Sequence, residues 1–412
     1  MELILFHTSY LKAFHEFLVI SIFFVKFFIL SNNIYKMNNL IYHEVIPNNL
    51  KSNGYKQNEN VDFDISVPNR KINLGSIRIE GELEVTSAGV FLNAAAAIAK
   101  DIKMDHLVGA HSLFESIVTS ISVPSKSIIE NLTEYPRYVK MATAATSGAD
   151  DMLNSNNMCE LKNSFPSFTT KVLQGVVPKE NFAANPIRLN PDFSVRPLIA
   201  MNSAQGSASY RQVGDVQITL TLNRVNGVFY GNDAATDVDY TIRDLKIRFT
   251  SSPDDGTDEA IVMKTKLAIK QSIQSSFANV QTRVPKICNA VTVSFQPQTE
   301  ENTGIYNNCQ LTRIENLTQT QYLFNDSTNT LISYVIKSDS EVQDRAIDSM
   351  LDTSRNSLSI QNLSNNNGFL AGIDFGMMVD LTNSKFSLQL TSGVSSSKPM
   401  LVYLYFHSFV EV

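Results

Sequence analysis

Short runs in which apolar and polar residues alternate recur along most of this chain. Side chains of a β-strand point to opposite faces in turn, so such a run indicates a strand with one face in a core. Clusters of Asn, Gly, Asp and Ser separate the runs at short spacing, which is typical of antiparallel sheets closed into sandwiches or barrels. The clearest runs are Val61–Val67, Lys71–Val85, Gln217–Asn223, Asp239–Ile242, Asp244–Thr250, Ile287–Phe295, Asp374–Leu381, Lys385–Thr391 and Met400–Phe409.

Few segments show helical spacing. Apolar residues three and four apart favour a short helix over Ser125–Leu132, directly after the long strand region His106–Val123, with Pro136 ending or kinking it. Glu341–Leu351 has its apolar residues on one helical face and predicts a short amphipathic helix between strands. Residues 140–210 carry several prolines and indicate a long loop.

Length and turn chemistry divide the chain into parts. Its 412 residues are enough for two domains of ordinary size. The best boundary is Ser251–Glu259, where turn residues and acidic residues follow a strong strand. We therefore predict an all-β protein with one domain over residues 61–255 and a second over residues 256–412, preceded by a flexible, Asn-rich arm at residues 37–60.

Residues 1–36 differ from the rest of the chain. The apolar run Phe17–Leu30 is interrupted by Lys26 and is shorter than the roughly 20 residues that span a bilayer. It follows no basic segment and precedes no cleavage site of small residues, so it is a poor secretory signal. We expect translation to start at Met37, with residues 1–36 outside the fold; a signal-anchor is the alternative. Mass spectrometry of the native N-terminus distinguishes the two.

Composition argues against a nucleic-acid-binding protein. Hydrophobic residues make up 43% of the chain, charged residues 18%, and the net charge is -6. A chain of this charge, with no dense stripe of Lys and Arg, is not expected to bind a phosphate backbone directly. The three cysteines, Cys159, Cys288 and Cys309, have no paired metal spacing and are expected to be free thiols in a reducing compartment.

One group of residues could be taken for a metal site. His106 and His111 are five residues apart, and Glu115 follows four residues later. Positions five apart lie on opposite faces of a strand, and this spacing does not match zinc ligands on a helix either. We interpret the three as strand residues that lie half in the core or at an interface.

Two acidic clusters could be taken for calcium sites. They comprise Asp233, Asp237 and Asp239, and Asp254, Asp255, Asp258 and Glu259. Both lack the Gly and Glu positions of a calcium-binding loop, so solvated turns are the better interpretation. The chain also lacks the nucleotide, dinucleotide and zinc-protease motifs. We assign no catalytic, cofactor-binding or metal-binding residue and expect no enzyme and no cofactor.

The order of these features resembles the double jelly-roll major capsid proteins of the polinton, adintovirus and virophage-like group of DNA viruses. The likeness covers most of residues 61–412 and none of residues 1–36. The segments that carry it are Gly109–Val123, Ile128–Asn131, Tyr135–Tyr138, Phe193–Asn202, Gly214–Leu222, Tyr240–Phe249, Ser275–Phe295, Phe324–Ser327, Gly372–Leu390 and Tyr403–Phe409.

The resemblance implies two adjacent eight-stranded jelly-roll sandwiches and a homotrimer that forms a pseudo-hexagonal capsomer of an icosahedral virion shell. It also implies contacts between capsomers and with penton or minor capsid proteins. The arm at residues 37–60 would join neighbouring subunits or face an inner membrane.

Two other classes of protein remain open on sequence alone. A secreted or surface β-sandwich binding module, such as an attachment spike or a lectin, would use residues 1–36 as a signal. The sequons at Asn131, Asn316, Asn325 and Asn362 would matter in that case. An enzyme on a β scaffold would need a cleft of residues with perturbed pKa values.

Overall fold

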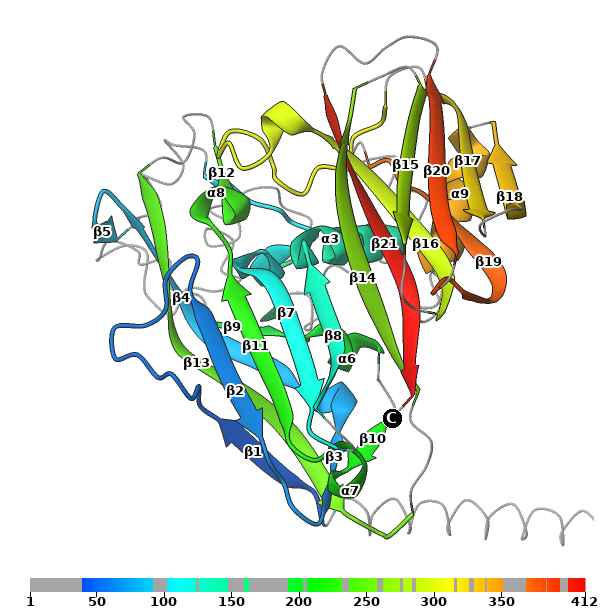
Figure 1. Cartoon of the computed structure of the whole chain (residues 1–412). Helices are drawn as coiled ribbons and strands as arrows, with labels where there is room; N and C mark the ends of the chain where they lie inside the picture. The colour runs from blue at the N-terminus through cyan, green and yellow to red at the C-terminus, as the bar shows by residue number, and fades with distance from the viewer. Residues whose placement is uncertain are drawn as a thin grey trace, which may run out of the picture.

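The computed structural model describes residues 39–91, 102–123, 126–146, 159–162, 192–202, 206–231, 237–257, 262–274, 277–283, 287–314, 317–325, 330–337, 339–350, 368–382, 384–392 and 399–411. They form two β-sandwiches, the first at the lower left of Figure 1 and the second at the upper right. Named by their central strands, the first sandwich has a β13 sheet and a β11 sheet, and the second has a β21 sheet and a β20 sheet.

The strands of the first sandwich lie between residues 41 and 253. The β13 sheet contains β1 (Ile41–Val45), β13 (Val238–Pro253), β4 (Arg78–Ser87) and β9 (Asp192–Val195), extended by β3 (Arg70–Asn73), β10 (Ser207–Ser209) and β5 (Val90–Phe91). The β11 sheet contains, in order, β2 (Asn60–Ile65), β11 (Val216–Leu222), β7 (Phe114–Ile121) and β8 (Ser127–Thr133). A separate small ladder pairs β6 (Lys103–Met104) with β12 (Phe229–Tyr230).

The second sandwich lies between residues 262 and 411. Its β21 sheet contains, in order, β14 (Val262–Ile273), β21 (Met400–Glu411), β16 (Ile287–Pro297) and β19 (Ala371–Asp380). Its β20 sheet contains, in order, β15 (Phe277–Arg283), β20 (Lys385–Ser392), β17 (Leu317–Asn325) and β18 (Thr330–Ile336).

In both halves the strands pair in nested order. In the second half β14 pairs with β21, β15 with β20, β16 with β19 and β17 with β18, all antiparallel. In the first half β1 pairs with β13, β2 with β11, β4 with β9 and β7 with β8. This nesting of first strand with last is the pairing of an eight-stranded jelly roll. The expected all-β double jelly roll is therefore confirmed.

Short helices occupy the connections. The α-helices are α3 (Tyr135–Thr146), α6 (Leu198–Asn202), α7 (Tyr210–Val213), α8 (Val225–Val228) and α9 (Asp339–Met350), and the 3-10 helices are η1 (Leu74–Ser76), η2 (Gly109–Leu113) and η4 (Gln298–Glu300). The helix predicted at Glu341–Leu351 is confirmed as α9. No helix in the described part of the chain is long and apolar enough to cross a membrane.

The helix predicted over Ser125–Leu132 is wrong, because Ser127–Thr133 form β8. The register of β8 against β7 shifts at Thr119/Ser120, so that Ile129 is an extra residue in its strand. This bulge brings Ile129 and Leu132 to the core three residues apart, which imitates helical spacing. The actual helix, α3, begins at Tyr135, and Pro136 lies in its first turn, where a missing N–H costs nothing.

Two other segments differ from expectation. Ile41–Val45, inside the arm predicted to be flexible, form β1, because β13 is long enough to pair with it as well as with β3 and β4. The predicted loop at residues 140–210 includes the end of α3 together with β9, α6 and β10. Residues 1–36 and most of residues 147–191 lie outside the described residues.

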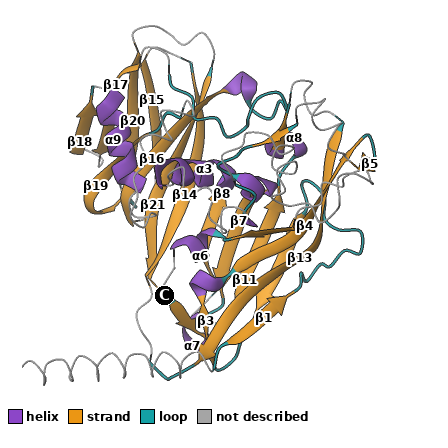
Figure 2. Ribbon diagram, turned by 180° about the vertical axis from the view of Figure 1, so that it is seen from behind, coloured by secondary structure: helices purple, strands orange, loops and turns teal. Residues whose placement is uncertain are grey.

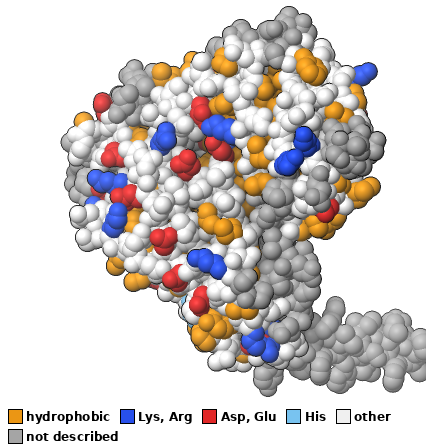
Figure 3. Space-filling model, viewed as in Figure 1, with side chains coloured by type: hydrophobic (Ala, Val, Ile, Leu, Met, Phe, Trp, Pro, Cys, Tyr) orange, Lys and Arg blue, Asp and Glu red, His pale blue; other side chains and the backbone are white. Residues whose placement is uncertain are grey.

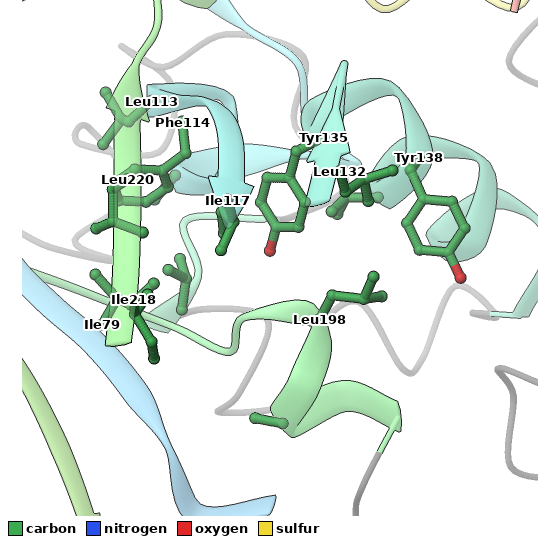
Figure 4. Close-up of a cluster of buried hydrophobic side chains, with 14 of the residues drawn as sticks. Ile79, Leu113, Phe114, Ile117, Leu132, Tyr135, Tyr138, Leu198, Ile218 and Leu220 are labelled. Carbon is green, nitrogen blue, oxygen red and sulfur yellow. The ribbon is translucent and has the colours of Figure 1, made fainter. Parts of the chain in front are cut away.

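The buried side chains of the first sandwich are the ones that the alternating sequence pattern predicts. In β11, Val216, Ile218, Leu220 and Leu222 are buried, while the residues between them are half-buried. Figure 4 shows Ile218 and Leu220 with the buried side chains of neighbouring elements, among them Ile117, Leu132, Tyr135 and Leu198.

Candidate functional site

The structure does not bring together the three residues that could be taken for a metal site. We expected His111 to lie in a strand, but it lies in η2, where its side chain is buried. His106 lies in the turn before η2, and Glu115 lies in β7. Over the residues that the structure describes, no group of three or more His, Cys, Asp or Glu side chains could hold a metal ion.

Two of the described members of the acidic clusters form ion pairs with basic side chains. Asp254 pairs with Arg211 at 3.2 Å, and Asp255 pairs with Lys71 at 2.5 Å. Asp237 and Asp239 lie at the start of β13. Asp233, Asp258 and Glu259 lie outside the described residues.

The three cysteines are free thiols, with Cys288 and Cys309 buried and Cys159 exposed. Burial raises the pKa of Cys309 to about 12, so this thiol does not ionise at neutral pH. Of the sequons, Asn131 is exposed on β8 and Asn325 ends β17, whereas Asn316 and Asn362 lie outside the described residues.

Many buried side chains meet at the junction between the two jelly rolls, where α3 lies between them (Figure 2). Strand β21 buries both of its faces there. Val402, Leu404 and Phe406 enter the core of the second sandwich. Leu401, Tyr403 and Tyr405 belong instead to the core of the first. Strand β21 therefore lies between the two cores and contributes side chains to both.

Arg137 of α3 has a fully buried guanidinium group at this junction. It donates hydrogen bonds to the backbone oxygens of Gln310 at 2.6 Å and Asn308 at 2.5 Å, and to the side-chain oxygen of Gln296. The guanidinium also lies 3.9 Å from the centre of the Tyr403 ring, in cation–π geometry. All four partners belong to the second half, so Arg137 fastens the first jelly roll to the second.

A second polar contact across the junction centres on Asp105. Its Oδ2 atom lies 2.5 Å from Nζ of Lys140 and accepts a hydrogen bond from Asn307 at 2.6 Å. Burial acts to raise the pKa of Asp105, but Lys140, His106 and Asn307 outweigh it and lower that pKa to about 2. The Asp105 carboxylate therefore stays charged at neutral pH.

Glu160 organises a buried ionic cluster inside the first half. Its carboxylate lies 3.0 Å from Lys162, 3.2 Å from Nε2 of His111 and 3.4 Å from Arg196. Burial lowers the pKa of His111 to about 4, so the ring is neutral at pH 7. A hydrogen on Nε2 then faces Glu160, while Nδ1 lies 2.7 Å from the Tyr135 hydroxyl oxygen. The Tyr135 hydroxyl donates a hydrogen bond to the backbone oxygen of Arg196 at 3.2 Å.

Glu130 of β8 is a buried carboxyl beside the junction. Burial raises its pKa from 4.5 to about 7, although hydrogen bonds from Thr119, Ile199 and Leu198 act to lower it. At a pH between 4.5 and about 7, Glu130 keeps its proton in the folded chain but releases it in the unfolded chain. Stability therefore falls as pH rises from about 4.5 to about 7, and the full cost remains above that range.

We expect Glu130→Gln to stabilise the protein by about 1–3 kcal/mol at pH 8.5 and to change little at pH 4.5, since glutamine carries no charge to bury. Chemical denaturation at the two pH values measures this difference. Glu341→Gln, at an exposed position of α9, is the control and should leave the pH profile unchanged. A stabilisation by Glu130→Gln that is equal at both pH values would contradict the prediction.

A polar pocket of about 230 Å³ opens at the junction. Lys270 bridges two of its carboxylates, Glu134 at 3.1 Å and Glu301. Cys309 also lines the pocket but is held as a neutral thiol. Its lining residues thus provide ion pairs without an activated nucleophile and a neighbouring base.

We did not predict the junction, although the sequence contains a signal for it. Alternation breaks down in Tyr403–Phe409, where nearly every residue is aromatic, apolar or buried. A strand that is apolar at successive positions is buried on both faces. Arg137 itself has no such signal, because its partners are backbone oxygens and an amide more than 150 residues away along the chain.

The fold is similar to those of solved viral structures. A chain of the Sputnik virophage is 11% identical, with 90% of this chain and 88% of that chain covered and a TM-score of 0.53. A chain of the PBCV-1 virus capsid is 10% identical, with 90% and 94% covered and a TM-score of 0.52. The Faustovirus major capsid protein is 9% identical, with 90% of each chain covered and a TM-score of 0.50.

No protein-family model matches the sequence, and the search of curated proteins finds no match. At identities this low, the structural similarity shows that the chain has the double jelly-roll fold.

Proposed function

We propose that this double jelly-roll chain is the major capsid protein of an icosahedral DNA virus and acts as a building block rather than as an enzyme. The observation that carries the proposal is the complete nested pairing of both halves, joined by a buried junction. Two sandwiches fastened in this way form one stiff unit, and a stiff unit can occupy two neighbouring places in a shell. The similarity in fold to chains of the Sputnik and PBCV-1 structures supports the same role.

In this proposal three copies associate into a pseudo-hexagonal capsomer, and capsomers then meet each other and penton or minor capsid proteins. The net charge of -6 favours a shell that does not contact DNA directly. The segment at residues 37–60 contains β1, which pairs with β13 and otherwise borders its sheet. In this proposal the segment meets a neighbouring subunit or an inner membrane. The protein would accordingly be located in the virion.

Purification of the full chain tests the proposal. We expect light scattering after size-exclusion chromatography to give about three times the chain mass of 45.9 kDa. Negative-stain electron microscopy should show three-fold particles with a six-sided outline. A chain that remains monomeric at high concentration would count against the proposed function.

A further inference from the structure

The outer face of the β20 sheet is almost free of charge. Strand register places its outward residues in rows across the four strands, and all of them are amide, hydroxyl or apolar side chains. They are Phe277, Asn279, Gln281, Gln319, Gln321, Leu323, Ser333, Val335, Ser387, Gln389 and Thr391. Phe277 is 54% exposed and Val335 is 44% exposed. Among the described side chains of this face, the charged ones stand at the strand ends and are the cations Arg283, Lys385 and Lys337.

The outer face of the β11 sheet has the same character with the opposite charge at its border. Its outward residues across β11, β7 and β8 are Gln217, Thr219, Thr221, Ser116, Val118, Ser120, Ile128, Asn131 and Thr133. The carboxylates Asp62 and Asp64 lie on its edge strand β2, and Glu115 lies at the start of β7. Lys126 precedes β8 at the far end. This face is turned to the viewer in Figure 1 and is mostly white in Figure 3.

The β13 sheet of the same chain shows how a solvated sheet face is built here. Its outer face is covered by ion pairs, in which Glu44 lies 3.3 Å from Lys246 and 3.1 Å from Arg248, and Glu84 lies 2.5 Å from Arg243. Depletion of charge is typical of the buried centre of a protein interface. The β20 and β11 faces therefore differ from the solvated face in the way that contact surfaces do.

We propose that the β20 face of one copy packs against the β11 face of a second copy of this chain. Each face is four strands wide and about seven residues long, roughly 450 Å² by ordinary strand dimensions, which suits the core of an interface of about 800 Å² per partner. The cations bordering one face complement the carboxylates bordering the other.

Two different faces in contact make a head-to-tail interface, which closes into a ring when the rotation between copies permits. The inference rests on the proposed function and names the surfaces that hold the trimer together.

A charge swap tests the pairing on the full chain. Arg283→Glu with Lys385→Glu should raise the dissociation constant of the trimer at least about tenfold, because carboxylates then face Asp62 and Asp64. Adding Asp62→Lys and Asp64→Lys to the same chain should restore it to within about threefold of the parent. Arg345→Glu, a single charge reversal at an exposed position of α9, is the control and should leave the trimer intact.

A second variant does not depend on ion pairs. Gln389→Arg puts a bulky charge at the centre of the β20 face and should dissociate the trimer while the circular dichroism spectrum of the folded chain stays that of the parent. A parent trimer that both β20-face variants leave intact, or a charge swap without rescue, overturns this inference and leaves the capsid proposal standing. A parent chain that never forms trimers overturns both.

Discussion

Arg137→Ala is expected to lower the free energy of unfolding by about 3–5 kcal/mol. The substitution leaves the backbone oxygens of Asn308 and Gln310 and the side chain of Gln296 without their donor in a buried place. Each such loss costs about 1–3 kcal/mol, and the contact with the Tyr403 ring is lost as well. Denaturant unfolding followed by circular dichroism measures the change.

Arg345→Ala is the matched control, because this arginine is 53% exposed on α9 and its removal should change stability by less than about 0.5 kcal/mol. Arg137→Lys should recover only part of the loss, since one ammonium group cannot reproduce the guanidinium fork. A stability of Arg137→Ala within about 1 kcal/mol of the parent would show that the guanidinium does not fasten the two halves.

Gly109→Ala is the second substitution with a large expected effect, about 3–4 kcal/mol of destabilisation. Gly109 has φ +58, and an added Cβ would lie 2.2 Å from the backbone oxygen of Glu160. That oxygen accepts the hydrogen bond from the Ala110 N–H at 2.8 Å, so the segment at residues 159–162 would have to move away. Glu160 would then leave Lys162 and His111, both of which are buried with it.

Gly89→Ala separates the steric effect from the effect of backbone conformation. Gly89 has φ +77, and nothing lies within 4 Å of the position of an added Cβ. Only the left-handed backbone then opposes the methyl group, at a cost of about 1–2 kcal/mol. Thermal melting of both variants compares them, and equal losses would mean that the close approach of Glu160 to Gly109 is unimportant.

The strands of this fold are largely predictable because each buries one face. The runs at Asp244–Thr250 and Lys385–Thr391 lie in strands of the structure, as does Gln217–Asn223 up to Leu222. The pattern fails where burial departs from a period of two. The bulge at Ile129 makes β8 resemble a helix, and the two buried faces of β21 remove its alternation.

The contacts that join the halves are harder to predict for a different reason. Arg137, Lys140 and Asp105 look in sequence like ordinary surface charges, and their partners lie far along the chain. His111 likewise shows no sign in the sequence that Glu160 and Tyr135 surround it. Sequence periodicity reports whether a side chain is buried, but not which distant residue it meets.

The position of β21 has a consequence for how subunits are made. This strand is synthesised after both of its neighbours, yet it lies between β14 and β16 and contributes side chains to both cores. A chain that terminates before Met400 leaves β14 without its partner strand, leaves β16 paired with β19 alone, and lacks the strand that lies between the two cores. Synthesis must therefore reach β21 before the two cores can close, so a chain truncated ahead of this strand is not expected to fold.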